Sequence, residues 1–566
     1  MAAYDSRPWV ASYAEGVPAD IEVPDGSLAD LIAESVAEFP DNVALEFFGR
    51  ETTYAELGDQ IARAAEGLRK LGVRKGDPVA LIMPNCPQHV AAFYAVLRLG
   101  GIVIEHNPLY TPRELRHQFE DHGAKVAIVW DKLVGEVQSF PKDIAVDRIV
   151  SVDITRAMPL RLRTLLRLPI ARARTQRAEL TAKVSGATSW EELLRNEPLA
   201  ASVPAPTSED VALIQYTSGT TGSPKGATLS HRNLTVNAAQ ARAWVPAIPR
   251  GTAVVYAVLP LFHAYGLTLC LTFAMSMGAR LALFPRFDPD LVIPVIRKHP
   301  PTFLPAVPPI YERLRAAAEQ TGVSIEGIRI AISGAMPLSQ AIITPWEELT
   351  KGYLVEGYGL SETSPVLMAN PVSERRKQGT VGLPLPGTEI RVVDPDEPTR
   401  DVAPGERGEL LVRGPQVMSG YWKKPEETAA VFVDGWFRTG DIVTVDEEGF
   451  VTIVDRIKEL VITGGFNVSP SEVEEALRGF EGVADVAVVG LPSARNGEEV
   501  VAAVVPEPGA TVDASALRAH GRQILGAYKV PRQVFMVDEL PKSLIGKVLR
   551  KKVREQLIEA GATASE

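Results

Sequence analysis

A loop rich in glycine, serine and threonine is the clearest chemical feature of the chain. It reads YTSGTTGSPKGA over residues 216–227 and follows VALIQY, an apolar run typical of a β-strand. Glycines let the backbone approach a ligand closely, and exposed N–H and hydroxyl groups donate hydrogen bonds to phosphate oxygens. Lys225 adds a positive charge near the end of the loop. The pattern predicts phosphate binding rather than a flexible linker. It is not a Walker A loop, because Lys225 stands between a proline and a glycine.

The elements around this loop alternate between strand-like and helix-like patterns through the first 450 or so residues. Such alternation predicts α/β layers with parallel strands. The first cycles are PVALIMP (78–84), QHVAAFYAVLRLG (88–100), IVIEHN (102–107), RELRHQFEDHG (113–123) and KVAIVW (125–130).

The pattern changes after Asp455, where the elements are short and charged. Strand-like runs at 483–492 and 499–507 indicate a small α+β lid domain of about a hundred residues. We therefore expect an N-terminal domain over residues 1–456 and a C-terminal domain over residues 457–566 that carries Lys547.

Length and charge restrict the classes of function. The chain has 566 residues, of which 46% are hydrophobic, and this is too long for one hydrophobic core. Its 59 lysines and arginines against 70 acidic residues give a net charge of −11, which argues against nucleic-acid binding. Two distant cysteines, Cys86 and Cys270, offer no disulfide framework and fit a reducing cytoplasm. The N-terminus shows no signal-peptide pattern. We therefore expect a cytoplasmic location.

Two segments bear on membrane contact. The stretch between Arg250 and Arg280 has no formal charge, but Pro260, His263 and Gly266 interrupt it, so we expect a buried strand followed by a buried helix rather than a membrane span. Residues 156–177 contain seven arginines, several leucines and no acidic residue. This segment is either a solvated surface excursion or a basic amphipathic patch that touches anionic lipid headgroups.

Six further motifs follow the loop in order, and the set resembles the adenylate-forming superfamily of acyl-CoA synthetases, peptide-synthetase adenylation domains and luciferases. Within it, the chain is most similar to bacterial long-chain fatty-acid–CoA ligases, as NPLYTPRELRHQFEDHGAK (107–125) and GPQVMSGYWKKPEET (414–428) illustrate. The six motifs are LPLFHAYG (259–266), ISGAMPL (332–338), EGYGLSET (356–363), GWFRTGD (435–441), DRIKELVITGGFNVSPSEVE (455–474) and PKSLIGKVLRKKV (541–553).

The resemblance implies a large N-terminal multi-layer α/β domain and a small, mobile C-terminal α+β domain. It implies an ATP-dependent acyl-CoA synthetase that uses Mg²⁺ and coenzyme A and passes a fatty acid, long-chain by likeness, through an acyl-adenylate. Alternatives are a fatty acyl-AMP ligase that serves a carrier protein, a medium-chain or aryl acid CoA ligase, a luciferase, and an inactive acyl- or nucleotide-binding homologue. The presence of Lys547 and Glu362 argues against the inactive homologue. A homodimer is also compatible with the resemblance.

Catalytic roles follow from the same resemblance. Lys547 would stabilise the charge that develops at the α-phosphate and acyl carboxylate. Glu362 and the Thr217 hydroxyl would hold Mg²⁺, a hard cation that prefers oxygen ligands. Asp441 would accept hydrogen bonds from both ribose hydroxyls. His263 would border the acyl group, although a lone histidine beside apolar residues is equally a core side chain.

The remaining implied site residues bind the nucleotide or serve the second half-reaction. Arg456 would contact the ribose or α-phosphate, Lys458 would be the interdomain hinge, and Gly464 and Gly465 would line the passage for the pantetheine arm after the C-terminal domain rotates. The other implied nucleotide contacts are Thr217, Ser218, Gly219, Thr220, Thr221, Gly222, Ser223, Lys225, Gly226, Gly334, Ala335, Glu356, Gly357, Tyr358, Gly359 and Ser361.

Overall fold

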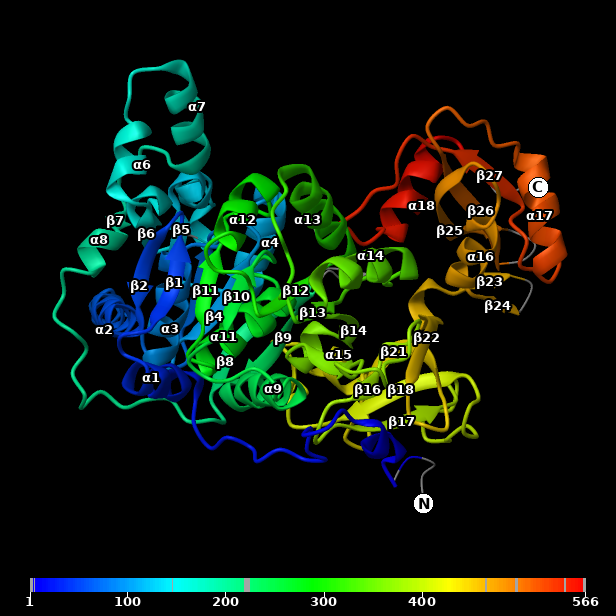
Figure 1. Cartoon of the computed structure of the whole chain (residues 1–566), viewed down its shortest axis with the longest axis horizontal. Coiled ribbons are helices and arrows are strands. Elements are labelled where there is room, and N and C mark those ends of the chain that lie inside the picture. Colours follow the sequence, from blue (N-terminus) through cyan, green and yellow to red (C-terminus); the bar gives the residue numbers. More distant parts are fainter. Residues whose placement is uncertain are drawn as a thin grey trace.

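A computed structural model of the chain describes residues 4, 6–144, 146–217, 224–463, 466–493, 497–543 and 546–562, with the backbone alone at 458, 466, 467 and 497. It contains a large N-terminal α/β body and a small C-terminal domain, which Figure 1 shows at the right in orange and red. This is the mixed α/β fold class that the sequence predicts.

The first large sheet carries the phosphate-type loop. In the described chain it has eight strands in the order β19-β9-β8-β4-β3-β5-β6-β7. The core strands are parallel, and β3 and β4 are buried almost throughout, as expected when helices cover both faces of a parallel sheet. The bounds are β3 Pro78–Ile82, β4 Ile102–His106, β5 Val126–Trp130, β6 Arg148–Val152, β7 Thr188–Ser189, β8 Val211–Thr217, β9 Lys225–Ser230 and β19 Gly420–Tyr421.

The second large sheet carries three of the implied motifs. Its described strands run in the order β16-β15-β14-β13-β12-β10-β11-β1-β2, and the central ones are parallel. The bounds are β1 Val43–Phe47, β2 Arg50–Thr53, β10 Val254–Ala257, β11 Arg280–Leu283, β12 Phe303–Ala306, β13 Ile330–Ser333, β14 Tyr353–Gly359, β15 Val366–Ala369 and β16 Leu383–Pro384.

A third, antiparallel sheet holds the aspartate and arginine motifs, and Figure 1 shows it in yellow below the C-terminal domain. Its strands are β17 Glu389–Val393, β18 Gly408–Arg413, β20 Phe432–Val433, β21 Trp436–Val445 and β22 Val451–Arg456. The C-terminal sheet consists of β23 Val461–Thr463, β24 Phe466–Val468, β25 Val483–Ser493, β26 Gly497–Pro506 and β27 Gln533–Met536.

Helices of the N-terminal body cover the two large sheets. Several begin where the sequence supplies a capping box, such as Thr53 with Glu56 in α2 and Thr111 with Glu114 in α4. The helices are α1 Leu28–Glu38, α2 Tyr54–Lys70, α3 Pro87–Arg98, α4 Pro112–His122, α5 Val134–Gln138, α6 Leu160–Leu165, α7 Ala171–Leu180, α8 Trp190–Leu193, α9 His231–Trp244, α10 Ala264–Gly266, α11 Phe273–Ser276, α12 Pro289–Ile296, α13 Pro308–Thr321, α14 Gln340–Thr350 and α15 Pro425–Ala429.

The C-terminal domain has its own core on both faces of its sheet. Because side chains alternate along a strand, Val486 and Val488 of β25 pack on one face and Ala487 and Val489 on the other. The first face is covered by α16 Pro470–Arg478 and α17 Ala514–Ile524, and the second by α18 Arg550–Glu559. The main N-terminal core ends in sequence at Val451, and this second core begins at Val461.

The uncharged stretch between Arg250 and Arg280 is buried as predicted. Strand β10 is followed by α10, the π-helical turn η5 (Leu267–Thr272) and α11, all within the main core. In the described part of the chain, no helix is both long enough and apolar enough to span a membrane.

Candidate active site

The ribose-binding candidate Asp441 lies at a junction of two sheets. Its Cα is paired in register with that of Arg456 across β21 and β22, and the Arg456 Nε lies 2.8 Å from the Asp441 Oδ1. From β14, the Tyr358 hydroxyl donates a hydrogen bond to the Asp441 Oδ2 at 2.5 Å. Asp441 is only 1% exposed. Burial, the largest single cause, would lower the pKa of Arg456, but the charges of Asp441, Tyr358 and Glu459 and the hydrogen bond to Asp441 together outweigh it and raise the pKa. Arg456 and Tyr358 therefore hold the two buried carboxylate oxygens of Asp441 at fixed positions.

Lys547 approaches this pair from the C-terminal domain. Burial and then the positive charge of Arg456 lower the pKa of Lys547 to about 8, while Glu459 and Asp441 oppose the shift. The Ser543 N–H donates to the Lys547 carbonyl at 2.7 Å. An ammonium group with a lowered pKa, beside an arginine and a carboxylate, is typical of a catalytic position.

The turn after β13 joins two of the implied motifs. A Cβ atom on Gly334 would lie 3.1 Å from the ring of Tyr265, and the Tyr265 hydroxyl donates to the Ile332 carbonyl at 2.6 Å. Ala335 adopts a φ of 66°, which is unusual outside glycine. A Cβ on Gly266 would lie 2.1 Å from the Pro260 carbonyl oxygen. Close packing therefore accounts for both glycines, so their small size is no measure of the space for an acyl chain.

Strand β14 contributes a buried carboxyl group. Glu356 accepts a hydrogen bond from the Leu338 N–H at 3.3 Å, and burial raises the pKa of Glu356 to about 7. Two glycines on the strand permit close approach of neighbouring chain. A Cβ on Gly357 would lie 3.2 Å from the Ile332 Cγ2, and one on Gly359 would lie 1.8 Å from the Pro365 carbonyl oxygen.

Glu362 lies beside the strands that carry the phosphate-type loop. It sits in the η6 turn (Ser361–Thr363), is 9% exposed and accepts a hydrogen bond from the Tyr421 hydroxyl at 2.8 Å. Thr217 ends β8, and its Cα partner is Lys225, which begins β9; both strands contact η6. The Lys225 Nζ lies 5.1 Å from the centre of the Tyr421 ring. The buried carboxylate, and the threonine hydroxyl at the end of an adjoining strand, are hard oxygen donors of the kind that Mg²⁺ prefers.

His263 is the N-cap residue that precedes the short helix α10. Its Nδ1 accepts a hydrogen bond from the Tyr265 N–H at 3.2 Å, and burial lowers its pKa to about 4. The ring is therefore neutral at physiological pH and serves as a cap in this structure. The motif also contacts β8, because the Gln215 Nε2 donates to the Phe262 carbonyl at 3.1 Å.

Several implied site residues lie outside the described residues, namely Ser218, Gly219, Thr220, Thr221, Gly222, Ser223, Gly464 and Gly465, as does the side chain of Lys458. Gly226 lies within β9, where a Cβ would come within 2.4 Å of the Ile214 Cγ2.

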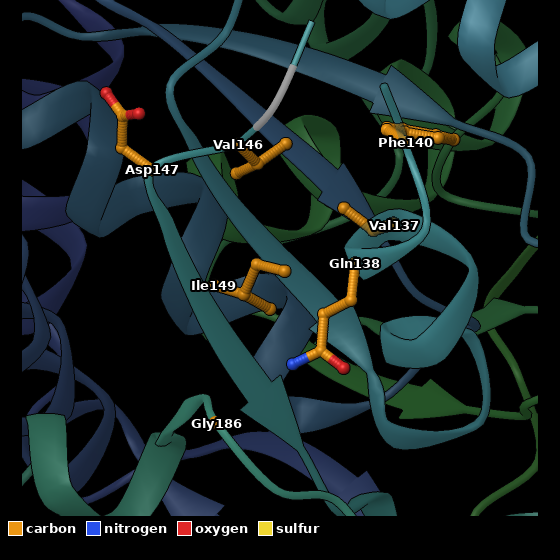
Figure 2. Close-up of a pocket in the computed structure, with 7 residues that line it drawn as sticks. All are labelled: Val137, Gln138, Phe140, Val146, Asp147, Ile149 and Gly186. Atoms are coloured by element: carbon orange, nitrogen blue, oxygen red, sulfur yellow. The ribbon is translucent and has the colours of Figure 1, made fainter. Parts of the chain in front are cut away.

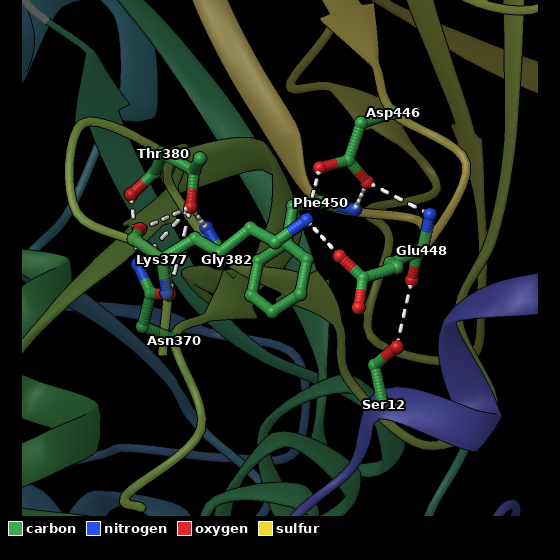
Figure 3. A network of polar contacts seen from close by, with 8 residues as sticks. All are labelled: Ser12, Asn370, Lys377, Thr380, Gly382, Asp446, Glu448 and Phe450. Carbon is green, nitrogen blue, oxygen red and sulfur yellow. Dashed lines mark hydrogen bonds and ion pairs between the residues drawn. The ribbon is translucent and has the colours of Figure 1, made fainter. Parts of the chain in front are cut away.

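The turn that joins β21 to β22 is held by a separate polar network, shown in Figure 3. Lys377 pairs with Asp446 at 2.7 Å and with Glu448, and its Nζ lies 4.8 Å from the centre of the Phe450 ring. From the N-terminal segment, the Ser12 hydroxyl donates to the Glu448 carbonyl at 3.0 Å. The network fixes the far end of the two strands that position Asp441 and Arg456.

A cavity and a cluster of possible metal ligands lie elsewhere in the molecule, and neither suits the binding of phosphate groups. A cavity of about 160 Å³, drawn in Figure 2, has one charged residue, Asp147, among its described lining residues, and this carboxylate would repel a phosphate. Glu46, Glu51 and His299 form a metal-type cluster, but Arg280 already pairs with both glutamates. The cavity is lined by Val137, Gln138, Phe140, Val146, Asp147, Ile149 and Gly186.

Comparison with known proteins shows the family to which the chain belongs. The model of the AMP-binding enzymes matches residues 32–422, and that of the AMP-binding enzyme C-terminal domain matches residues 472–547. The chain belongs to the AMP-binding enzyme family. A relative in this family, the long-chain-fatty-acid–CoA ligase of Bacillus subtilis (strain 168), is 39% identical over 98% of each chain.

Solved structures of AMP-binding enzymes share the fold. The ATP-bound RpMatB-BxBclM chimera B3 aligns with a TM-score of 0.81 at 30% identity, over 94% of this chain and 100% of the other. The anthranilate CoA ligase AuaEII in complex with anthranoyl-AMP aligns with a TM-score of 0.80 at 25% identity, over 96% and 99%. These two proteins carry ATP or an acyl-adenylate.

The geometry brings forward three residues to which the sequence interpretation gave no individual role. Tyr421 hydrogen-bonds to Glu362, Tyr265 packs on Gly334, and Met336 lies against the Lys547 loop at Gly546. All three belong to quoted motifs, but only their tertiary partners reveal their roles.

Proposed function

We propose that the chain is an ATP-dependent acyl-CoA synthetase that converts a long-chain fatty acid, ATP and CoA into acyl-CoA, AMP and pyrophosphate through an acyl-adenylate. The main support is the convergence of Lys547 on Asp441 and Arg456, which joins the C-terminal domain to the nucleotide-type motifs. The name of the Bacillus subtilis relative supports the substrate class.

In the proposed first step, a carboxylate oxygen attacks the α-phosphorus of ATP and pyrophosphate leaves. Lys547 stabilises the negative charge that develops around the α-phosphate and the acyl carboxylate. Mg²⁺, held by Glu362 and the Thr217 hydroxyl, would supply charge neutralisation at the phosphates. His263, neutral because burial lowers its pKa to about 4, borders the acyl group and takes no proton.

The proposed nucleotide site surrounds the Asp441 carboxylate. Asp441 accepts hydrogen bonds from the ribose hydroxyls, Arg456 contacts the ribose or the α-phosphate, and Tyr358 orients the carboxylate. The other proposed contacts are Ser218, Gly219, Thr220, Thr221, Gly222, Ser223, Lys225 and Gly226 at the phosphates, and Gly334, Ala335, Glu356, Gly357, Gly359 and Ser361 around the base.

In the proposed second step, the CoA thiol attacks the acyl carbonyl and AMP leaves. The C-terminal domain, residues 457–566, turns about Lys458 relative to residues 1–456 and removes Lys547 from the site. Gly464 and Gly465 then line the passage for the pantetheine arm. Positioning and charge stabilisation account for both steps without a covalent protein intermediate.

The test is incubation of the purified protein with MgATP and a chain-length panel of fatty acids, with and without CoA, and identification of the products by mass. Acyl-CoA plus AMP from long-chain acids supports the proposal. Lys547→Ala should abolish these products. Lys551→Ala, which removes an exposed lysine four residues along the same segment, is the matched control.

Other products would identify the alternatives. Acyl-AMP that persists when CoA is present would indicate an acyl-AMP ligase that serves a carrier protein. An aryl acid is the second candidate substrate, because the AuaEII structure contains anthranoyl-AMP at a TM-score of 0.80. Preference for anthranilate or benzoate over palmitate would replace the long-chain proposal.

The proposal extends to the setting of the enzyme. It acts in the cytoplasm, as a homodimer, and makes peripheral contact with membranes through residues 156–177. The exposed arginines of that segment support the contact. Light scattering of the purified protein tests the homodimer, because a monomer mass at micromolar concentration would contradict it.

A further inference from the structure

The arginine-rich segment forms a helical hairpin that stands away from the body of the molecule. Helices α6 and α7 project at the upper left of Figure 1, beyond the edge of the sheet that ends in β6 and β7. The base of the hairpin is anchored. The Trp130 Nε1 donates to the Leu180 carbonyl at 2.8 Å, and the Thr181 hydroxyl donates to the Asp131 Oδ2 at 2.9 Å. These two hydrogen bonds attach the base of the hairpin to the N-terminal body.

The apolar side chains of the hairpin are divided between two environments. Leu162, Leu166 and Leu180 are partly buried and pack against the main core. Four others face solvent, with exposed fractions of 74% at Leu160, 54% at Leu165, 41% at Leu168 and 53% at Ile170. Four large aliphatic side chains exposed within eleven residues indicate a surface that contacts something apolar.

Six of the seven arginines of residues 156–177 have no acidic partner among the residues that the structure describes. At the base, Arg156 lies 3.6 Å from Asp153. Within the described part of the chain, the other six have no carboxylate oxygen within 4.0 Å, and five of these six are exposed. They are Arg161, Arg163, Arg167, Arg172, Arg174 and Arg177. A strongly positive patch thus stands on a chain whose net charge is −11.

We propose that the α6–α7 hairpin docks on the surface of a bilayer that contains anionic phospholipids. The exposed aliphatic side chains enter the boundary between headgroups and acyl chains, and the arginines pair with lipid phosphates and carboxylates. Both features occur on one projecting element, which favours a lipid surface over a nucleic acid, because phosphate-backbone binding needs the arginines but not the leucines.

This inference deepens the proposed function, since a long-chain fatty acid partitions into membranes and would be taken up where the enzyme docks. Docking itself requires no turnover. The hairpin lies outside the residues proposed for catalysis, so its variants should retain the basal reaction with a water-soluble acid such as octanoate.

The experiment is flotation of the full-length protein with vesicles of phosphatidylcholine alone or with one third phosphatidylglycerol. The triple variant Arg161→Glu, Arg167→Glu, Arg174→Glu should lower partitioning onto the anionic vesicles roughly tenfold or more. The triple variant Leu160→Ser, Leu165→Ser, Ile170→Ser should lower partitioning by a similar order and leave its salt dependence unchanged. Lys351→Glu, Arg407→Glu, Arg522→Glu, which reverses three exposed cations elsewhere, is the matched control and should bind as the parent does.

Three results would overturn the docking surface. They are unchanged flotation of both hairpin variants, an equal loss in the control, and loss of tRNA binding without loss of vesicle binding. If the glutamate variant misfolds by circular dichroism, Arg161→Gln, Arg167→Gln, Arg174→Gln gives the same decision. Absence of octanoate turnover in the parent protein would count against the proposed function alone, because flotation is measured without ATP.

Discussion

The sulfur atom of Met336 lies 3.0 Å from the position that a Cβ atom on Gly546 would occupy. Met336 belongs to the turn after β13 in the N-terminal body, whereas Gly546 precedes Lys547 in the C-terminal domain. The two residues therefore mark the point where the lysine loop is seated on the larger domain. This seating corresponds to the orientation in which Lys547 would serve adenylation.

Enlarging Gly546 should weaken this seating. Gly546→Ala adds a Cβ against Met336 at a φ of 81°, where side chains are strained, and we expect the adenylation rate to fall roughly tenfold or more. Gly509→Ala is a matched control, because Gly509 in the same domain has the same φ but nothing within 4 Å of its Cβ position. Stopped-flow or quench measurement of acyl-AMP formation compares the adenylation rates of the two variants. Equal losses would show that backbone strain, and not the contact with Met336, causes the effect.

The lowered pKa of Lys547 predicts a pH dependence of adenylation. Since burial and Arg456 bring the pKa to about 8, the ammonium charge is present below this pH and is lost as the pH rises through it. We expect kcat/KM for ATP to have a descending limb near pH 8. In the pH profile of kcat, the descending limb should lie at higher pH, because the phosphates of bound ATP favour the charged form of Lys547.

Replacement of the lysine by arginine separates this cause from others. Lys547→Arg keeps its charge throughout the range, so whatever activity remains should lack the limb near pH 8. A limb that persists unchanged in this variant would assign the titration to another group, and the proposed role of the lysine charge would lose its support.

Asp441 should be the residue that detects the ribose hydroxyls. Replacing it by alanine should raise the KM for ATP roughly 10- to 100-fold, the range for hydrogen bonds to a charged acceptor. The same variant should no longer distinguish ATP from 2′-deoxy-ATP or 3′-deoxy-ATP. Tyr358→Phe, which removes the hydroxyl at 2.5 Å but keeps the carboxylate, should retain most of the discrimination. Undiminished preference for ATP in Asp441→Ala would place the ribose elsewhere.

Glu356 should make stability depend on pH. Burial raises its folded-state pKa to about 7, above the value of an unfolded glutamate, so the folded state holds the proton more tightly between about pH 4.5 and 7. Its contribution to the free energy of unfolding is therefore present at low pH and is lost as the pH rises to about 7. Glu356→Gln should stabilise the protein by about 1–3 kcal/mol more at pH 8 than at pH 5.

Urea unfolding at the two pH values measures this difference. Glu348→Gln on α14, which replaces an exposed carboxylate nearby in sequence, provides the control. If Glu356→Gln changed the free energy of unfolding by the same amount at both pH values, the carboxyl group would be ionised at both.

Local pattern was enough to predict the repeating elements. The runs at 78–84, 88–100 and 102–107 correspond to β3, α3 and β4, because buried parallel strands are continuously apolar and the mostly apolar helix between them is buried at every position except Arg98. The order of the strands was not predictable in this way. β4 and β5 lie on opposite sides of β3, a placement that depends on crossovers between distant segments.

The site shows the same limit. The resemblance named Asp441, Tyr358 and Glu362, but it did not give their contacts. Tyr358 contacts Asp441, 83 positions away in sequence, and Glu362 contacts Tyr421, 59 positions away. The seating of Gly546 on Met336 depends on how two separate cores face one another, which no local periodicity records. The close packing at Gly266 and Gly334 likewise depends on tertiary neighbours, the Pro260 carbonyl oxygen and the Tyr265 ring.

The most direct measurement compares the two half-reactions in the parent protein and in Lys547→Ala. Acyl-AMP formation from palmitate and MgATP is followed in the absence of CoA, and acyl-CoA formation is followed from synthetic palmitoyl-AMP and CoA. The account predicts that Lys547→Ala loses the first half-reaction and retains the second. Equal loss of both, or adenylate formation that survives without the lysine, would contradict it.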